Sequence, residues 1–201
     1  AELERIAAGT LSPGAWAYIA GGAGREATID ANRAALDAAR IVPRMAIDAS
    51  RRDLSVRLFG KTLPTPFLTC PIGVMSLAHA DSDLAVARGA AAVGAPMIIS
   101  NQASFPMEEI AAAAPGPKSF QLYWGRSDEL VASLVGRAKA AGCEAIVITL
   151  DTTILGWRCR DLDLAHLPFL KGLGIAQYTS DPYFRSLLAD PPETNMLGAA
   201  A

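Results

Sequence analysis

The stretch KSFQLYWGRSDELVASLVGRAKAAGCEAIVITLD, residues 118–151, carries the pattern that decides the predicted fold. Two short apolar runs, 118–124 and 144–151, stand on either side of a helical segment, 126–142. That segment is acidic at its start, basic at its end and closed by a glycine. These are the usual signals for the two ends of a helix. The stretch is therefore predicted to fold as strand, helix, strand.

The same alternation extends toward the N-terminus. Apolar runs at 66–71 and 96–100 are predicted strands, and residues 81–94 and 106–114 are predicted helices. Repeated strand–helix units with short connections predict parallel strands that are covered by helices. Two architectures fit this order: an open doubly wound sheet and a (β/α)8 barrel.

Before these units the pattern is helical. The predicted helices cover residues 2–9, 13–20 and 25–39. Residues 53–66 alternate apolar and polar positions on either side of Gly60–Lys61, which predicts a hairpin. GGAG at 21–24 precedes a helix but follows no strand, so it is a weak candidate for a phosphate-binding loop.

Composition limits the classes of function. The 201 residues are 51% hydrophobic and 19% charged, which argues against disorder and fits one domain or part of a larger one. A net charge of −2 gives no electrostatic reason to expect nucleic acid or an anionic membrane as partner. No apolar run approaches the length of a membrane span, and the acidic, helical N-terminal stretch does not resemble a signal peptide.

The titratable side chains give few signals of metal or nucleophilic chemistry. Three cysteines without a CxxC spacing fit a reduced, cytoplasmic protein, and Cys70 and Cys143 are predicted to be small core residues. His79 and His166 have no ligand-spaced partner, so a metal site is not expected. The pair Arg51–Arg52 is predicted to lie in a solvated loop.

Polar residues near the ends of three successive predicted strands point to a ligand. Ser100, Gln121 and Thr149 are neutral hydrogen-bonding side chains in otherwise apolar runs. A buried polar group without a partner costs about 1–3 kcal/mol. For one such residue a bond to the neighbouring backbone is explanation enough, but three at matching depth favour a shared ligand. A flat, mostly apolar body with polar edges, such as a flavin ring, fits them.

A second set suits a carboxylate. Tyr18, Tyr123 and Arg158 offer phenol hydroxyls and a guanidinium, which bind carboxylates well. Taken alone, each tyrosine is more often a packed aromatic with a solvated tip.

Several longer stretches extend these observations to a known family. They are YIAGGAGREATIDAN (18–32), PRM (43–45), DLSVRLFGKTLPTP (53–66), CPIGVMSLAH (70–79), FQLYWGRS (120–127) and ITLDTTILGWRCRDL (148–162). With them the chain resembles the FMN-dependent 2-hydroxy acid oxidases and dehydrogenases, which include glycolate oxidase, mandelate dehydrogenase and lactate 2-monooxygenase. The last stretch, followed by LPFLKGL and YTSDPYF, is most similar to lactate 2-monooxygenase.

The resemblance implies an α/β fold, the first half of a (β/α)8 TIM barrel with an N-terminal helical segment and a short β-hairpin. The implied boundaries are 1–52 for the helical segment, 53–65 for the hairpin, 66–151 for the first four β/α units, and 152–201 for an active-site loop and a truncated C-terminal end.

The resemblance also implies roles for individual residues. The implied FMN contacts are Pro71, Ile72, Gly73, Ser100, Gln121 and Thr149. Tyr18, Tyr123 and Arg158 match residues that bind the substrate carboxylate, and Tyr123 and Arg158 also match catalytic positions. Asp151 matches the catalytic aspartate that orients a base histidine.

The implied reaction is the FMN-dependent oxidation of a small, lactate-like L-2-hydroxy acid to a 2-keto acid, with oxygen as acceptor and oxidative decarboxylation as an open outcome. Family members are roughly twice as long and are homo-oligomers, here expected to be tetramers. Their second half supplies a lysine, the base histidine, an arginine and the phosphate-binding loops, which these 201 residues do not contain. This chain alone is therefore expected to be inactive, and a second chain could supply that half.

Two positions depart from the family pattern. Gln102 stands where members similar to glycolate oxidase carry tryptophan, and Gly73 stands where several oxidases have alanine. Substrate size and the handling of oxygen are therefore left open. Two rival functions remain: a catalytically silent half-barrel that binds a ligand or assembles with a partner chain, and another FMN barrel such as an isomerase. The pair Tyr123 and Arg158 disfavours the isomerase, because it suits a small carboxylate.

Overall fold

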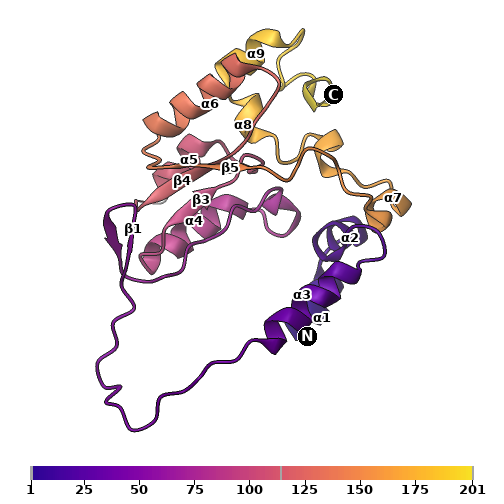
Figure 1. The fold of residues 1–201 in the computed structure, drawn as a ribbon. Helices are drawn as coiled ribbons and strands as arrows, with labels where there is room; N and C mark the ends of the chain where they lie inside the picture. Colours follow the sequence, from indigo (N-terminus) through magenta and orange to yellow (C-terminus); the bar gives the residue numbers. More distant parts are fainter. Residues whose placement is uncertain (1, 114, 201) are drawn as a thin grey trace. The chain divides into compact units, whose positions relative to one another are not determined.

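The computed structural model describes residues 2–113 and 115–200, which fall into two compact units. Unit 1 comprises Ala1–Leu54 with Ile154–His166, and unit 2 comprises Ser55–Thr153 with Leu167–Ala201. Helices occur in both units, and the labelled strands belong to unit 2 (Figure 1). No helix among the described residues is both long and apolar enough to cross a membrane.

Unit 1 is built from helices. Its helices are α1 (Glu2–Thr10), α2 (Pro13–Ala20), α3 (Ala27–Ala38) and α7 (Cys159–Asp163). The three helices predicted in this region are confirmed, with ends shifted by at most two residues. Ser12 begins α2 because its hydroxyl accepts from the Ala15 amide at 3.3 Å, and Pro13 fits the first helical position.

The segment between α2 and α3 is a turn. The Gly22 amide donates to Glu26 Oε1 at 3.1 Å, and the Gly24 amide donates to the Trp157 carbonyl at 2.7 Å. Two of the amides that a phosphate would need are thus already bonded within unit 1. Residues 40–54, beyond α3, are exposed and contain no helix or strand, which confirms the solvated loop predicted for Arg51–Arg52.

Unit 2 begins with a hairpin. Strands β1 (Val56–Leu58) and β2 (Lys61–Leu63) pair antiparallel, with Val56 opposite Leu63. The turn is formed by Phe59 and Gly60, both with positive φ (48° and 78°), as a tight hairpin turn requires. The predicted hairpin is present, but its turn lies one residue earlier than Gly60–Lys61.

A parallel sheet forms the centre of unit 2. Strands β3 (Met97–Ile99), β4 (Lys118–Tyr123) and β5 (Ile146–Thr149) lie in the order β3-β4-β5. Helices α4 (Ser82–Ala92), α5 (Met107–Ala113) and α6 (Asp128–Ala140) alternate with them along the chain. The predicted α/β alternation from 81 to 149 is therefore confirmed.

The core of unit 2 lies between the strands and these helices. Its members are apolar residues at strand positions and along the inner faces of the helices, among them Ala87, Ile99, Met107, Ile110, Phe120, Leu122, Leu134 and Ala138. Cys143 packs against this core and is half-buried. Burial raises the pKa of its thiol to about 11, so this cysteine stays protonated and unreactive near neutral pH.

The run 66–71 does not become a strand, contrary to the prediction. It makes one isolated bridge, Thr69 with Met97, in which the Thr69 amide donates to the Pro96 carbonyl at 3.0 Å. Pro66 and Pro71 lack the amide donors that a longer ladder needs. Cys70, predicted to be a core residue, is exposed, since this run does not become an inner strand of the sheet.

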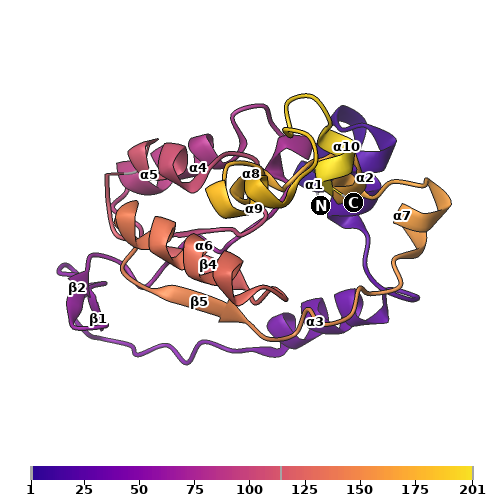
Figure 2. The ribbon, with the colours of Figure 1, turned by 90° about the horizontal axis from the view of Figure 1, so that it is seen from above.

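The chain after residue 167 returns to unit 2 as short helices. They are the 3-10 helix η2 (Pro168–Lys171) and the helices α8 (Ala176–Thr179), α9 (Pro182–Leu187) and α10 (Met196–Ala200). A further 3-10 helix, η1 (Met75–Leu77), precedes α4. Helix α9 lies beside α6 in both views (Figures 1 and 2).

Candidate functional site

Three polar side chains meet near the carboxyl ends of β3, β4 and β5. Gln121 Nε2 donates to Thr149 Oγ1 at 2.7 Å, and Gln121 Oε1 accepts a longer bond of 3.4 Å from Ser100 Oγ. Gln121 and Ser100 are 2% and 4% exposed, so this is a buried network, and Thr149 at its end is half-buried. The residues come together because the parallel register sets Gln121 between the strands that carry the other two.

The orientation of the Gln121 amide follows from its partners. The Asn101 backbone amide donates to Gln121 Oε1 at 2.9 Å, and an N–H group can only donate. Oε1 must therefore face residues 100–101, and Nε2 must face Thr149. Thr149 Oγ1 accepts this bond and keeps its own proton for donation. The donors of Gln121 and Thr149 thus lie together at the β5 side of the network.

Tyr123, at the end of β4, is half-buried and is linked to the same network through Asn101. The Tyr123 amide donates to Asn101 Oδ1 at 3.3 Å, and Asn101 Nδ2 donates to the Tyr178 hydroxyl at 2.6 Å. Asn101 is fully buried. The sequence reasoning did not identify Asn101 or Tyr178 as site residues. The polar residue directly after Ser100 was the signal for the first, and YTSDPYF contained the second.

The loop after residue 69 carries Pro71, Ile72 and Gly73. Gly73 lies so close to the β3–α5 loop that a Cβ there would stand 2.9 Å from Gln102 Cβ. The Val74 amide fixes this approach by donating to the Gln102 carbonyl at 2.9 Å. Thr69 Oγ1 is buried and has no hydrogen-bond partner among the residues that the structure describes. The backbone of this loop therefore lies against residue 102, and the loop is preceded by a buried Thr69 hydroxyl without a hydrogen-bond partner.

A buried acid ties these loops together. Asp83, in the first turn of α4, is 1% exposed, and its Oδ2 accepts from the Ser104 amide and the Ser82 hydroxyl, both at 2.8 Å. Ser104 Oγ in turn accepts from the Ser76 amide at 3.1 Å. Burial, which is not offset by a cation, raises the pKa of Asp83 above its ordinary value, although the two hydrogen bonds oppose it.

Unit 1 holds the remaining pair of carboxylate-binding candidates together. The Arg158 guanidinium lies over the Tyr18 ring, 4.9 Å from its centre, and Nη2 donates to the Tyr18 carbonyl. Arg158 Nε also donates to Asp161, whose side chain is 1% exposed. Asp161 was not predicted from the sequence. It lies in α7, three residues after Arg158, which immediately precedes that helix.

Asp151 lies two residues beyond β5, in the loop that leaves unit 2, and it is exposed. The structure therefore places it near the end of the same strand as Thr149, outside the buried network. Among the described residues, no group of three or more His, Cys, Asp or Glu side chains could hold a metal ion.

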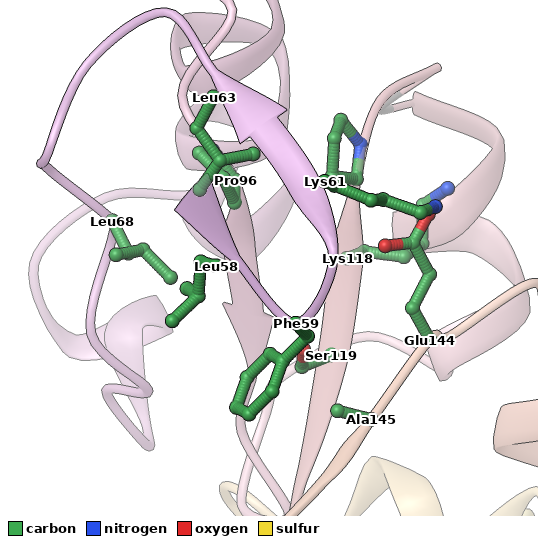
Figure 3. Close-up of a pocket in the computed structure, with 11 residues that line it drawn as sticks. Leu58, Phe59, Lys61, Leu63, Leu68, Pro96, Lys118, Ser119, Glu144 and Ala145 are labelled. Atoms are coloured by element: carbon green, nitrogen blue, oxygen red, sulfur yellow. The ribbon is translucent and has the colours of Figure 1, made fainter. Parts of the chain in front are cut away.

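A cavity of about 140 Å³ lies at the other end of the strands (Figure 3). The hairpin covers it with Leu58, Phe59 and Leu63, and the Lys61–Glu144 ion pair stands at its side. Its strand residues are Lys118 and Ser119, at the amino end of β4. In parallel α/β folds the chemistry is found at the carboxyl ends of strands, so this cavity is not the candidate site.

The comparisons with known proteins assign the chain to a family. The family model for FMN-dependent dehydrogenases matches residues 7–197. The chain belongs to the FMN-dependent dehydrogenase family. The resemblance inferred from the sequence is thereby confirmed, and FMN is the cofactor of this family.

Relatives and solved structures within the family include several oxidases. L-lactate oxidase from Lysinibacillus sphaericus (strain C3-41) is 41% identical over 94% of this chain and 49% of its own length. 4-Hydroxymandelate oxidase from Amycolatopsis orientalis is 41% identical over 81% of this chain and 45% of its own length. A structure of mandelate oxidase with (S)-2-phenylpropionate matches with a TM-score of 0.81 at 38% identity, over 90% of this chain and 54% of that one. The chain thus spans about half the length of the relatives it matches.

The residues of unit 2 fit the cofactor of this family. A flavin ring needs neutral donors and acceptors around a flat body, and Ser100, Gln121 and Thr149 supply them from a pre-oriented network. The buried Thr69 hydroxyl, which has no hydrogen-bond partner among the described residues, is a further neutral polar group in unit 2.

Proposed function

We propose that this chain forms part of an FMN-dependent enzyme that oxidises a small, lactate-like L-2-hydroxy acid to a 2-keto acid, with oxygen as acceptor. The observation that carries the proposal is the buried Ser100–Gln121–Thr149 network near the carboxyl ends of three adjacent parallel strands. The chemistry that FMN supplies when bound is the acceptance of hydride equivalents from the substrate.

Unit 2 is proposed to be the first half of a (β/α)8 barrel. The sequential order β3-β4-β5, with no reversal, is the order of such a barrel and supports this reading. The TM-score with mandelate oxidase supports it as well. The proposed domain boundaries remain 1–52, 53–65, 66–151 and 152–201.

The proposed roles divide between cofactor and substrate. Ser100, Gln121 and Thr149 hydrogen-bond the flavin ring, and the backbone of 71–73 lies against it. Tyr18, Tyr123 and Arg158 bind the substrate carboxylate through phenol hydroxyls and a guanidinium. Asp151 holds the tautomer of a base histidine that this chain does not supply, and stabilises its cationic form.

Decarboxylation is proposed as the outcome that distinguishes a lactate 2-monooxygenase-like enzyme. The support is the sequence around residues 148–184, which resembles lactate 2-monooxygenase. The alternative is a simple oxidase, since relatives such as L-lactate oxidase and 4-hydroxymandelate oxidase carry that name. Product analysis decides between the two. Lactate should give acetate and carbon dioxide in the full-length enzyme, and accumulation of pyruvate with hydrogen peroxide would identify a simple oxidase instead.

The assembled protein is proposed to be a homo-oligomer, a tetramer by family resemblance, in a reducing, cytoplasmic environment. The three free cysteines fit that environment. Size-exclusion chromatography with light scattering measures the assembly directly. A monomer that retains FMN and oxidises lactate would contradict the tetramer and leave the reaction intact.

A silent half-barrel that assembles with a partner chain is the second candidate. The observation in its favour is the exposure of Val147, Ile148 and Leu150 on and after β5, the last strand of the described sheet. Absorption spectroscopy separates the candidates. A flavin spectrum in the purified full-length protein favours the enzyme, and colourless, self-associating material favours the silent fragment.

A further inference from the structure

Asn101 joins the two proposed halves of the site in unit 2 and is itself fully buried. Its backbone amide donates to Gln121 Oε1 at 2.9 Å, on the flavin side. Its side-chain Oδ1 accepts from the Tyr123 amide at 3.3 Å, on the substrate side. Its Nδ2 donates to the Tyr178 hydroxyl at 2.6 Å. Every polar atom of the side chain is therefore engaged.

The chemistry of the partners leaves one orientation for the Asn101 amide. The Tyr123 backbone N–H can only donate, so the oxygen of the Asn101 side chain must face it. Nδ2 then necessarily points to Tyr178, whose hydroxyl can accept. The Tyr178 hydroxyl thus decides how firmly Asn101 Oδ1 is held against Tyr123.

Tyr178 is a rigid support for this contact. It sits in α8, and its ring packs against Phe184 with centroids 5.7 Å apart. The next residue along the chain toward the N-terminus, Gln177, is fully buried and ties α8 to the start of α5 through the Met107 amide (3.0 Å) and the Phe105 carbonyl (3.1 Å). Burial raises the pKa of Tyr178, and the bond from Asn101 lowers it in part.

We propose that Asn101 is a positioning residue, whose side chain, braced by Tyr178, sets the backbone of Tyr123 for the substrate while its backbone amide sets the Gln121 side chain for the flavin. This inference rests on the proposed function, because it takes Tyr123 as a substrate residue and Gln121 as a flavin contact. The two roles are separable. Substitution of the Asn101 side chain leaves its backbone amide in place, so substrate binding should change and flavin binding should not.

The test uses the full-length, FMN-loaded enzyme with three variants. Asn101→Leu removes both side-chain hydrogen bonds of residue 101. Tyr178→Phe removes only the hydrogen bond between Asn101 and Tyr178. Tyr183→Phe is the matched control, since it deletes the same hydroxyl from a half-buried tyrosine five residues away that has no bond to Asn101. Asn101→Asp is the conservative rescue, because a carboxylate oxygen can accept from the Tyr123 amide and from the Tyr178 hydroxyl.

We expect Asn101→Leu to raise the KM for the 2-hydroxy acid by about 10-fold and Tyr178→Phe by about 3-fold, in line with the loss of one or two modest hydrogen bonds. The flavin spectrum and the Kd for FMN should stay at their wild-type values. Tyr183→Phe should leave KM unchanged, and Asn101→Asp should recover most of the loss. Unchanged KM in both Asn101→Leu and Tyr178→Phe would overturn the inference.

A second measurement needs no bound FMN. Ultraviolet difference titration of the tyrosines, with Tyr178→Phe used to assign the signal of Tyr178, should show a higher pKa for Tyr178 in Asn101→Leu than in the wild type. The reason is that the donated bond that stabilises the phenolate is lost. An unchanged titration shows that the Asn101–Tyr178 bond is absent and overturns the inference. A wild-type protein that binds no FMN overturns the proposed function itself. The tyrosine titration does not depend on FMN, so it still tests the Asn101–Tyr178 hydrogen bond in that case.

Discussion

Thr149 offers the sharpest test of the flavin network at the level of single residues. Its hydroxyl accepts from Gln121 Nε2 at 2.7 Å and keeps a proton to donate to the cofactor. Thr149→Val removes the hydroxyl at nearly constant volume. A net hydrogen bond is worth about 1 kcal/mol, so the Kd for FMN should rise about 5-fold.

Fluorescence titration of FMN with the apoenzyme measures this change. Thr152→Val is the matched control, because Thr152 lies in the exposed loop after β5 and is the same residue type. Equal Kd values for the two variants would remove Thr149 from the cofactor site.

Asp83 gives a prediction about pH. Burial raises its pKa in the folded state, so the folded protein holds this proton at pH values where the unfolded chain has released it. Stability contributed by the protonated form is full below the unfolded pKa, near 3.9, and is lost as the pH rises through the folded pKa. Asp83→Asn abolishes the titration. Since both hydrogen bonds reach one oxygen, Oδ2, an asparagine oxygen can replace it.

The measured quantity is the free energy of unfolding from denaturant titrations between acidic and neutral pH. Asp83→Asn should gain stability relative to the wild type as the pH rises, by about 1.4 kcal/mol for each unit by which the folded pKa is raised. A difference between the two proteins that does not vary with pH would contradict the raised pKa.

Single residues also show what could be read from the sequence. Ser100, Gln121 and Thr149 were found because a polar side chain in an apolar run stands out. Cys70 was misplaced in the core because its apolar neighbours say nothing about whether a second ladder covers them. Asn101 was missed because its partner Tyr178 lies 77 residues away in the chain. Asp161 was missed, although its partner Arg158 lies only three residues away, because the sequence does not show that the Asp161 side chain is buried.

At the scale of elements, Arg137 of α6 fixes α8 and α9 to the helical layer of unit 2. Its guanidinium donates to both oxygens of Glu108, to the Gln177 carbonyl and to Asp181, whose side chain is fully buried. Asp181 also begins α9, because Oδ1 accepts from the Tyr183 and Phe184 amides. The Arg137 side chain is itself 13% exposed.

Arg137→Met should therefore lower the free energy of unfolding by about 2–4 kcal/mol, because it leaves a buried carboxylate without its cation. Arg88→Met is the control: its ion pair with Asp81 is solvent-exposed and should be worth about 0–1 kcal/mol. Chemical denaturation of both variants makes the comparison. Equal losses would show that the Arg137 cluster is no stronger than a surface pair.

Elements with strong local signals were predictable, and those that depend on neighbours were not. Helix α6 has a serine cap, early acids and late bases, and it is present at Asp128–Ala140. The run 66–71 has strand-like composition but prolines at both ends, and one bridge is all that it forms. The short helices after residue 167 have fewer such signals. Asp181 accepts from backbone amides at the start of α9 and Asn195 accepts from the Gly198 amide in α10, but α8 has no side-chain cap.

For the molecule as a whole, the proposed function requires residues outside this chain, so we predict that residues 1–201 alone do not oxidise lactate. The chain spans about half the length of the relatives it matches, and the proposal assigns the base histidine and the phosphate-binding loops to the other half. Steady-state oxygen consumption with added FMN and lactate checks this on the purified chain. Lactate oxidation by this chain without a second polypeptide would refute the proposal that the active site needs both halves. Recovery of lactate oxidation on adding the rest of the enzyme would support it.

The close approach of Gly73 to Gln102 has an evolutionary consequence. A Cβ at position 73 would stand 2.9 Å from Gln102 Cβ and 3.3 Å from the Gln102 carbonyl oxygen, which also holds the Val74 amide. Neither position can therefore drift independently, because the residue tolerated at 73 depends on the backbone path at 102. The effects of substitutions at positions 73 and 102 on stability are therefore expected to be non-additive, so that a change at either residue constrains what the other can become.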